Sequence, residues 1–398
     1  MVTTTTARSL IADRTGKLQL SGIRKMMALA AKMPHVIRLE VGEPDFDTPA
    51  YISAAVKSDL DSGRYTHYTP VAGYPELRRA LATRLQHACG LTADPETEIM
   101  VSVGGAGALY SAIMATVNPG DEVLIPDPGY PQYTQMTLLA DGLPCLYPLR
   151  EENGFQPDLD ELRRLVTPQT KAIVLNSPQN PTGSVLDRRS LEGIAALAQE
   201  RNLLVISDEV YSTLVYDGSM HSIATFSGMF GRTITINSFS KAYAMTGWRL
   251  GYAAAAQPIM QEMIKIQSFF NSCASSVSQR AGLAALTSTA ESEAMTAEYR
   301  RRRDWLVQAL NALPGVRCLM PSGAFYVFPN IASFGLPAEQ FSLRLLDAAH
   351  VTSVAGTAFG PTGEGHVRLS FATSMENLQV AVERIAAALP RLAGSRER

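Results

Sequence analysis

Short apolar segments of strand length alternate with longer amphipathic segments through the middle of the chain. Their residues are largely apolar and rich in β-branched types. The strand-like segments are Ile99–Val103, Glu122–Pro126, Lys171–Asn176, Leu203–Ser207 and Thr233–Asn237. Strands that are apolar on both faces and alternate with helices are typical of a mostly parallel sheet covered by helices. We therefore expect an α/β fold.

One of the intervening helices is predicted with clear signals at both ends. Leucines recur every four residues over Pro75–Ala88, which places them on one face of a helix. Proline at the first position favours a helix start, and Gly90 follows as a stop.

The pattern changes after Thr287. A long charged helix is followed by two short strand-like pieces, Gly323–Phe328 and His366–Phe371, and by a final amphipathic helix. This order is typical of a smaller α+β domain. We expect the N-terminal segment, residues 1–45, to join this small domain at 287–398, and residues 46–286 to form a large domain.

The predicted long helix carries four consecutive arginines, Arg300 to Arg303. They could form an anion or partner site. Because Glu298 and Asp304 flank them at helical spacing, we expect a solvated, ion-paired face instead.

Composition excludes several classes of protein. The 35 Lys and Arg nearly balance the 37 Asp and Glu, and a net charge of −2 provides no basic field for a nucleic acid. No apolar stretch reaches the roughly 18–20 residues that span a bilayer, and the threonine run at 3–6 is read as a frayed terminus. We expect a cytoplasmic protein that binds neither membranes nor nucleic acid.

The cysteines and histidines predict no disulfide and no metal. No C-x-x-C pair and no H-E-x-x-H spacing occurs. We expect reduced, structural thiols at Cys89, Cys145, Cys273 and Cys318.

The most specific segment follows the last predicted strand. Lys241 lies just past the carboxyl end of Thr233–Asn237, near the usual ligand crevice of an open α/β sheet. Ser238 and Arg249 could both bind one phosphate, through a hydroxyl and a planar guanidinium. The alternative for this segment is a surface lysine beside a packed Trp248.

Three other predicted strands are also followed by segments whose residues could bind a ligand or take part in a reaction. Asn176–Gly183 contains Asn-Pro and a closing glycine, which can be a simple turn. Ser207–Tyr211 places Asp208 at a strand end, where it can be a helix cap. Gly104–Gly107 opens a helix whose N–H groups can approach a phosphate.

The glycine-rich segment leaves a dehydrogenase as a weak alternative. Tyr110 stands where the dinucleotide fingerprint G-x-G-x-x-G requires its third glycine. A tight turn is the other reading of this segment.

The four strand ends together offer a phosphate cradle, a carboxylate, a phenol with an amide, and a lysine. Pyridoxal 5′-phosphate requires this inventory, because its ring nitrogen, its 3′-oxygen, its phosphate and its aldehyde each need a partner. We therefore expect this cofactor.

The chain resembles the class I aminotransferases of the aspartate aminotransferase fold, fold type I of the pyridoxal phosphate enzymes. The resemblance runs from about Leu39 to Phe371. Besides the strand-end motifs, it is carried by the stretches Leu39–Pro49, Tyr68–Arg78 and His366–Ser370. It implies a large domain with a mostly parallel sheet and a smaller domain built from both chain ends.

The resemblance implies roles for the residues around the cofactor ring. Lys241 would hold the cofactor as a Schiff base and carry the proton between the substrate α-carbon and the cofactor. Asp208 would pair with the pyridine nitrogen. Asn180 and Tyr211 would bind the 3′-oxygen, and Tyr130 would stack on the ring.

The phosphate would be held by both subunits. The resemblance assigns it to the backbone amides of Gly105 and Ala106, with Ser238 and Arg249. Ala106 departs from the Thr or Lys often found in the family, so one side-chain contact is missing. Tyr68 would reach the phosphate of the neighbouring subunit, which implies a homodimer.

The substrate would be held by its α-carboxylate. The resemblance gives this role to Arg368, assisted by the Gly42 backbone and Asn180. The substrate side chain is then expected to meet a mainly aromatic and apolar lining around Ile23, Tyr68, Tyr130, Phe325 and Tyr326.

The implied reaction is a ping-pong transamination from an L-amino acid to a 2-oxo acid. The donor could be aspartate, the default, or an aromatic or other neutral amino acid, or arginine. A β-lyase, a decarboxylase or a ring-forming synthase on the same fold is the alternative. A non-catalytic effector-binding domain is a further alternative from another class.

Overall fold

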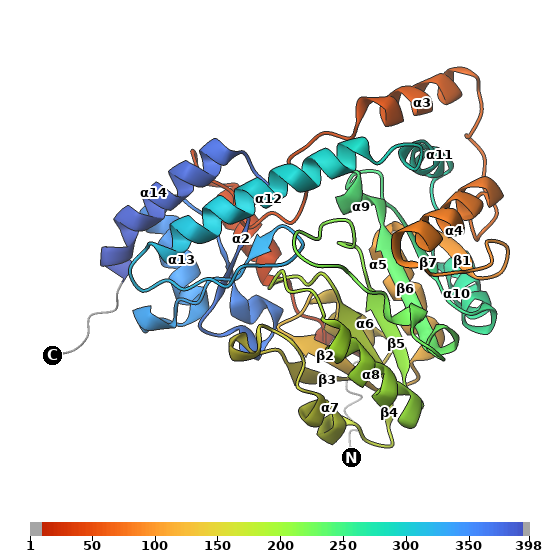
Figure 1. Cartoon of the computed structure of the whole chain (residues 1–398), viewed down its shortest axis with the longest axis horizontal. Helices are drawn as coiled ribbons and strands as arrows, with labels where there is room; N and C mark the ends of the chain where they lie inside the picture. Colours follow the sequence, from red (N-terminus) through yellow and green to blue (C-terminus); the bar gives the residue numbers. More distant parts are fainter. Residues whose placement is uncertain (1–9, 393–398) are drawn as a thin grey trace, which may run out of the picture.

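The computed structural model describes residues 10–392, so the threonine run at 3–6 lies outside the described part. Its main sheet has seven strands in the order β1-β7-β6-β5-β4-β2-β3 (Figure 1). Only β7 runs antiparallel to its neighbours within this sheet. The strands are β1 Ile99–Val103, β2 Glu122–Asp127, β3 Leu143–Pro148, β4 Thr170–Asn176, β5 Leu204–Asp208, β6 Thr233–Ser238 and β7 Leu250–Ala254.

The predicted α/β sheet is confirmed, and the five predicted strands lie within one residue of the observed ones. Two strands were missed. β3 is an edge strand with two prolines and little burial, so it lacks the apolar signal of a central strand. β7 returns antiparallel beside β6 after only the short helix α9 (Phe239–Ala242), outside the strand–helix alternation.

Alternate residues of the central strands pack against helices on opposite faces. In β4, Ala172 and Val174 belong to the apolar cluster with helices α5, α6 and α10, whereas Ile173 and Leu175 pack with α7 and α8. This two-sided burial explains why the strands read as continuous apolar runs. The helices are α4 Pro75–Cys89, α5 Gly104–Thr116, α6 Gln132–Leu139, α7 Leu159–Leu165, α8 Arg188–Glu200, α10 Gln257–Phe270 and α11 Ser276–Ala285.

The predicted helix after Pro75 is observed as α4. Its leucines Leu77, Leu81 and Leu85 are buried against β1 and β7. Gly90 ends it in a left-handed conformation with φ 76°, which glycine adopts without strain.

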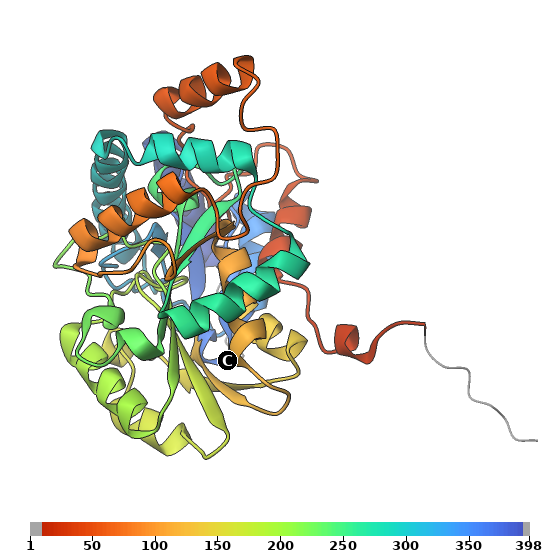
Figure 2. The same cartoon turned by 90° about the vertical axis from the view of Figure 1, so that its right-hand side faces the viewer.

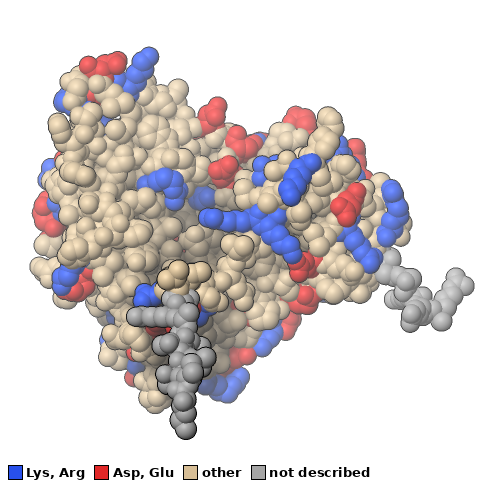
Figure 3. All heavy atoms as spheres, turned by 180° about the vertical axis from the view of Figure 1, so that it is seen from behind, with Lys and Arg blue, Asp and Glu red and all other residues tan. Residues whose placement is uncertain are grey.

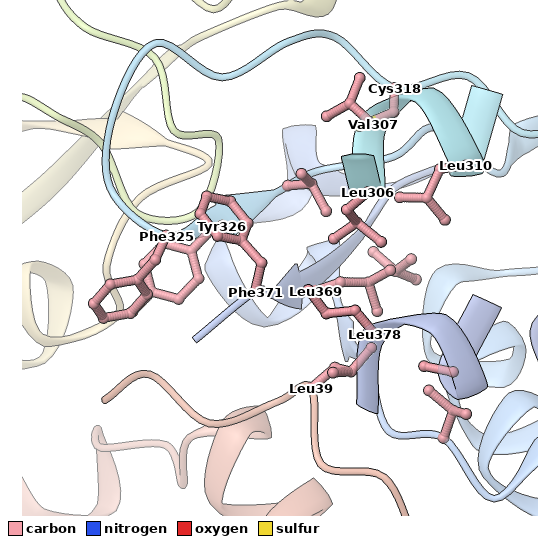
Figure 4. Packing of buried hydrophobic residues seen from close by; sticks show 14 of the residues in the cluster. Leu39, Leu306, Val307, Leu310, Cys318, Phe325, Tyr326, Leu369, Phe371 and Leu378 are labelled. Carbon is pink, nitrogen blue, oxygen red and sulfur yellow. The ribbon is translucent and has the colours of Figure 1, made fainter. Parts of the chain in front are cut away.

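The C-terminal part contains a second sheet of three antiparallel strands in the order β8-β10-β9. Leu39, from the N-terminal segment, packs in one apolar cluster with Leu306, Leu369 and Leu378, so both ends of the chain share this core (Figure 4). Its elements are α12 Ala290–Asn311, β8 Tyr326–Val327, α13 Ala338–Ala349, β9 Val354–Ala355, β10 Val367–Ser370 and α14 Met375–Leu392. The domain bounds 1–45, 46–286 and 287–398 stay a prediction.

The first helix projects from the rest of the fold (Figure 2). Lys17 forms an ion pair of 3.0 Å with Asp141, next to α6. The remaining helices and short 3-10 turns are α1 Asp13–Gly16, α2 Gly22–Ala30, α3 Ala50–Asp61, η1 Glu151–Asn153, η2 Ile223–Thr225, η3 Phe230–Arg232, η4 Ala332–Phe334, η5 Gly356–Phe359 and η6 Pro361–Gly363.

The expectation of a wholly solvated arginine face on α12 is wrong for two of the four arginines. Arg302 and Arg303 are 5% and 3% exposed, whereas Arg300 and Arg301 lie at the surface. Successive helical residues are rotated by about 100°, so four in a row cannot share one face. Arg302 donates to both carboxylate oxygens of Asp45, at 2.8 and 2.9 Å.

The surface carries acidic and basic side chains, in keeping with the near-zero net charge. On the face shown in Figure 3, basic and acidic side chains are interspersed. Within residues 10–392, no helix combines the length and apolarity needed to cross a bilayer. The same residues contain no group of three His, Cys, Asp or Glu side chains that could hold a metal. Cys89, Cys145, Cys273 and Cys318 are all free thiols.

The burial of Arg302 yields a matched pair of variants. Replacing Arg302 by Gln removes a buried guanidinium together with its charge-assisted hydrogen bonds to Asp45 and Glu298, and we expect a loss of about 2 kcal/mol in the free energy of unfolding. Arg301→Gln breaks only an exposed pair with Glu298, so its loss should stay below about 1 kcal/mol. Urea denaturation checks both, and equal losses would contradict the buried role of Arg302.

Candidate active site

A cavity of about 500 Å³ lies where the parallel strands β1, β4, β5 and β6 end at their carboxyl termini. Ala106 reaches it from the first turn of α5, and Asn180 from the loop after β4. Asp208 is the last residue of β5, and Lys241 lies in α9, directly after β6. The four strand-end segments identified in the sequence thus meet at one site, as expected for an open α/β sheet.

The structure brings most of the predicted site residues to this cavity. Those that line it are Ile23, Gly42, Gly105, Ala106, Tyr130, Asn180, Asp208, Tyr211, Ser238, Lys241, Arg249 and Arg368. Two do not line it. Tyr68 is 90% exposed at the surface of the chain. Phe325 is fully buried, with its ring centroid 5.7 Å from Nζ of Lys241, and its neighbour Tyr326 lines the cavity instead.

Asp208 is a buried carboxylate with a fixed orientation. The hydroxyl of Tyr133 donates to Oδ2 at 2.7 Å, and the backbone N–H of Val210 donates to Oδ1 at 3.2 Å. Burial raises the pKa of Asp208 to about 6, against the lowering effect of these hydrogen bonds and of Lys241. At neutral pH the carboxylate is mostly ionised and can pair with a protonated ring nitrogen.

Lys241 is a partly buried amine. Its Nζ donates to the backbone carbonyl of Gly42 at 2.5 Å. Burial lowers the pKa of Lys241 to about 8; Glu43 opposes this shift, and the cationic Arg249 and Arg368 add to it. With this pKa the neutral fraction of the amine near neutral pH is much larger than that of an ordinary lysine, which suits it as a nucleophile and base.

The end of the cavity near α5 can hold a phosphate. α5 begins at Gly104, and its first N–H groups lack helical partners, so they can bind an anion. A Cβ on Gly104 would lie 2.6 Å from Nη2 of Arg249, so this glycine leaves room for the guanidinium. Ser238 and Ser240 add hydroxyls, which contact each other at 3.0 Å.

Arg368 is the most deeply buried cation at the site. It donates to Oδ1 of Asn180 at 2.9 Å and to the Glu40 carbonyl at 2.6 Å. Its Nε is buried without a hydrogen-bond partner within the described chain. Burial lowers the pKa of Arg368, yet an arginine stays charged in proteins. A buried cation with a spare donor is suited to a carboxylate.

Sequence reasoning missed two polar contacts. Tyr133, which orients Asp208, is one helical turn beyond Tyr130, and this spacing was the available signal. Ser240 could have been found because it lies between Ser238 and Lys241 in the same motif. Tyr326 was expected only in the substrate lining; its hydroxyl also contacts that of Tyr211 at 2.8 Å.

The donor set fits pyridoxal 5′-phosphate. An anion site, a buried carboxylate and a partly buried amine line one cavity, and they supply partners for the cofactor's phosphate, ring nitrogen and aldehyde. Tyr130 also lines the cavity, and burial raises its pKa to about 12, so its phenol stays neutral. The unpartnered Nε of Arg368 leaves a donor for a carboxylate beside the cofactor groups.

Comparison with known proteins finds relatives of nearly full length. The chain is 46% identical to an aspartate aminotransferase of Pyrococcus abyssi over 379 residues, which are 94% of this chain and 97% of the relative. It is 43% identical to aromatic-amino-acid aminotransferase 2 of Thermococcus litoralis, over 94% of this chain and 97% of that relative.

Solved structures agree with the sequence relatives. The aspartate aminotransferase from Thermus thermophilus with maleate superposes with a TM-score of 0.91 at 39% identity, over 96% of this chain and 100% of that chain. The family model of aminotransferase class I and II matches residues 34–385. The chain therefore belongs to the class I and II aminotransferases, which use pyridoxal 5′-phosphate to move an amino group from an amino acid to a 2-oxo acid.

Proposed function

We propose that this aminotransferase takes its amino group from a neutral amino acid with an aromatic or apolar side chain. Lys241, Asp208 and Arg368 carry the reaction. The observation that supports the donor class is the charge distribution around the cavity. Each cation that the described residues of this chain place in the lining (Lys241, Arg249 and Arg368) has a partner on the cofactor or on the α-carboxylate, which leaves none of the three for a second carboxylate.

The cofactor, when bound, supplies the aldehyde carbon that accepts the amino group and a ring that withdraws electrons from it. Asp208 would hold the proton at the ring nitrogen, because its carboxylate is buried and oriented by Tyr133. Asn180 and Tyr211 would donate to the 3′-oxygen. Gly105, Ala106, Ser238 and Arg249 would hold the phosphate, with Tyr130 against the ring.

Arg368 orients the substrate. Its guanidinium would bind the α-carboxylate in a bidentate manner, with Asn180 and the Gly42 backbone beside it. This fixes the α-carbon near Lys241, and proximity of this kind supplies a large part of catalysis.

Lys241 moves the proton. Its amine, with a pKa lowered to about 8 by burial, can take the α-proton of the substrate and return it at the carbon that receives the amino group. A partly buried amine of lowered pKa is a more effective base near neutral pH than an exposed lysine.

The mouth of the cavity offers an apolar wall to the substrate side chain. Ile23 and Met27, both from α2, line it together with Val41 and Leu109. Glu43 also lines the cavity and would repel a second carboxylate. Ala106 offers only a methyl group at a position where the family often has a Thr or Lys. These contacts favour an aromatic or apolar donor over aspartate. Among the described lining residues, Glu43 is the only carboxylate besides Asp208, and a single exposed carboxylate offers no paired site for the guanidinium of an arginine donor.

A panel of amino donors tests this proposal. With pyruvate or 2-oxoglutarate as acceptor, kcat/KM for phenylalanine or tyrosine should exceed that for aspartate at least about tenfold, because a buried carboxylate without a partner is costly. Arginine should also be a poor donor. Faster turnover of aspartate or arginine would contradict the donor class, and 2-oxo acid formation without an acceptor would indicate a lyase.

We infer that the enzyme works as a homodimer in which Tyr68 reaches the neighbouring site. The Tyr68 ring is 90% exposed on the protomer, and so are two further apolar side chains, Leu20 at 95% and Phe269 at 88%. Contact with a second subunit would remove these apolar side chains from water, which is favourable. The projecting α1 supports the same reading (Figure 2).

Sedimentation and cofactor titration test the dimer. The protein should sediment at twice the 43.0 kDa chain mass. Tyr68→Phe should weaken cofactor binding about tenfold or more, because a hydrogen bond to a charged phosphate is lost. Tyr65→Phe, whose ring packs against Tyr74, is the matched control and should bind normally. A monomer, or unchanged affinity in Tyr68→Phe, would contradict the shared site.

A further inference from the structure

Tyr326 lies between the residues proposed to hold the substrate and those proposed to hold the cofactor. In the three-stranded sheet, Tyr326 of β8 pairs with Ser370 of β10. Arg368 is two residues from Ser370, so it lies on the same face as Tyr326, as its diagonal neighbour. The strand register therefore places the ring beside the guanidinium.

The ring of Tyr326 contacts the cation directly. Its centroid lies 4.4 Å from Cζ of Arg368, and the Phe359 ring contacts the same atom at 4.9 Å. Tyr326 and Arg368 are each 1% exposed. At a desolvated site a ring–guanidinium contact is strong, so these rings restrict the plane in which Arg368 meets a carboxylate.

The hydroxyl of Tyr326 contacts a residue proposed to hold the cofactor. It lies 2.8 Å from the hydroxyl of Tyr211, which follows β5 of the main sheet. A Cβ on Gly42 would come within 2.7 Å of the same hydroxyl, so the glycine leaves room for it. One side chain thus links the small sheet to the main sheet at the cavity.

We propose that Tyr326 is a positioning residue with two separable roles: its ring holds the Arg368 guanidinium, and its hydroxyl holds the Tyr211 phenol. The inference rests on the proposed roles of Arg368 and Tyr211. A hydroxyl carries one proton. If Tyr211 donates to the 3′-oxygen of the cofactor, Tyr326 must donate to Tyr211, which orients Tyr211 and makes it a better donor.

Tyr326→Phe removes the hydroxyl and keeps the ring. In the holoenzyme, the pH midpoint of the visible absorbance of the cofactor should move to higher pH, because Tyr211 stabilises the deprotonated form less. The shift should be smaller than that of Tyr211→Phe. The dissociation constant of 3-phenylpropionate, a carboxylate without an amino group, should change less than about twofold, because the ring–guanidinium contact remains.

Tyr326→Leu removes the ring as well. It should move the absorbance midpoint as Tyr326→Phe does, and also weaken 3-phenylpropionate binding about tenfold, because Arg368 loses its ring contact. Tyr147→Phe is the matched control. Its hydroxyl donates to the Val174 carbonyl at 2.8 Å within the large sheet, so its loss should affect stability and neither binding nor the midpoint.

Arg368→Lys distinguishes failure of the proposed role of Arg368 from failure of the proposed role of Tyr326. If it leaves the affinity for 3-phenylpropionate unchanged, the proposed role of Arg368 fails and the inference fails with it. If Arg368→Lys weakens binding but Tyr326→Leu does not, only the inference is overturned. An absorbance midpoint in Tyr326→Phe equal to that in Tyr147→Phe would also overturn it. Should Tyr326→Leu fail to fold, the midpoint of Tyr326→Phe decides.

Discussion

Burial of charge around one cavity is the constraint on which the rest of the structure depends. Asp208, Lys241 and Arg368 line the same cavity. Asp208 and Arg368 are buried, and Lys241 is partly buried. Burial is the largest cause of all three shifts: it raises the pKa of Asp208 and lowers the pKa of Lys241 and of Arg368. An isolated buried charge is costly. A ligand with an anionic end and a cationic ring would balance these charges, which is why the fold and the cofactor suit each other.

The two sheets supply different charged residues of the cavity. Carboxyl ends of the main sheet present Asp208 and Lys241 to the cofactor, whereas β10 of the small sheet presents Arg368 to the substrate. The sheets meet through few polar contacts at the cavity, among them Arg368 with Asn180 and Tyr326 with Tyr211. We infer that the geometry of the reaction depends on how these contacts fix one sheet against the other.

The main sheet and the strand-end residues could be predicted from the sequence because local pattern determines them. Central strands such as β4 are apolar on both faces, and the motif residues follow them directly. Long-range contacts left no such pattern. The contact of Tyr133 with Asp208 spans 75 residues, and that of Arg302 with Asp45 spans 257. Tyr133 was missed although it lies one helical turn beyond Tyr130, because its partner Asp208 is distant in sequence; Arg302 was expected on a solvated face for the same reason. Phe325 and Tyr326 are adjacent, and only the register of β8 decides which one faces the cavity.

The most direct test of the account is to find which lysine carries the cofactor. Borohydride reduces the bond between a lysine amine and the aldehyde carbon of pyridoxal 5′-phosphate to a stable secondary amine, and peptide mass spectrometry then locates the label. The account predicts one label per chain, on Lys241, because this is the amine that is partly buried and lines the cavity. A label on an exposed lysine such as Lys265, or no label after incubation with the cofactor, would contradict it.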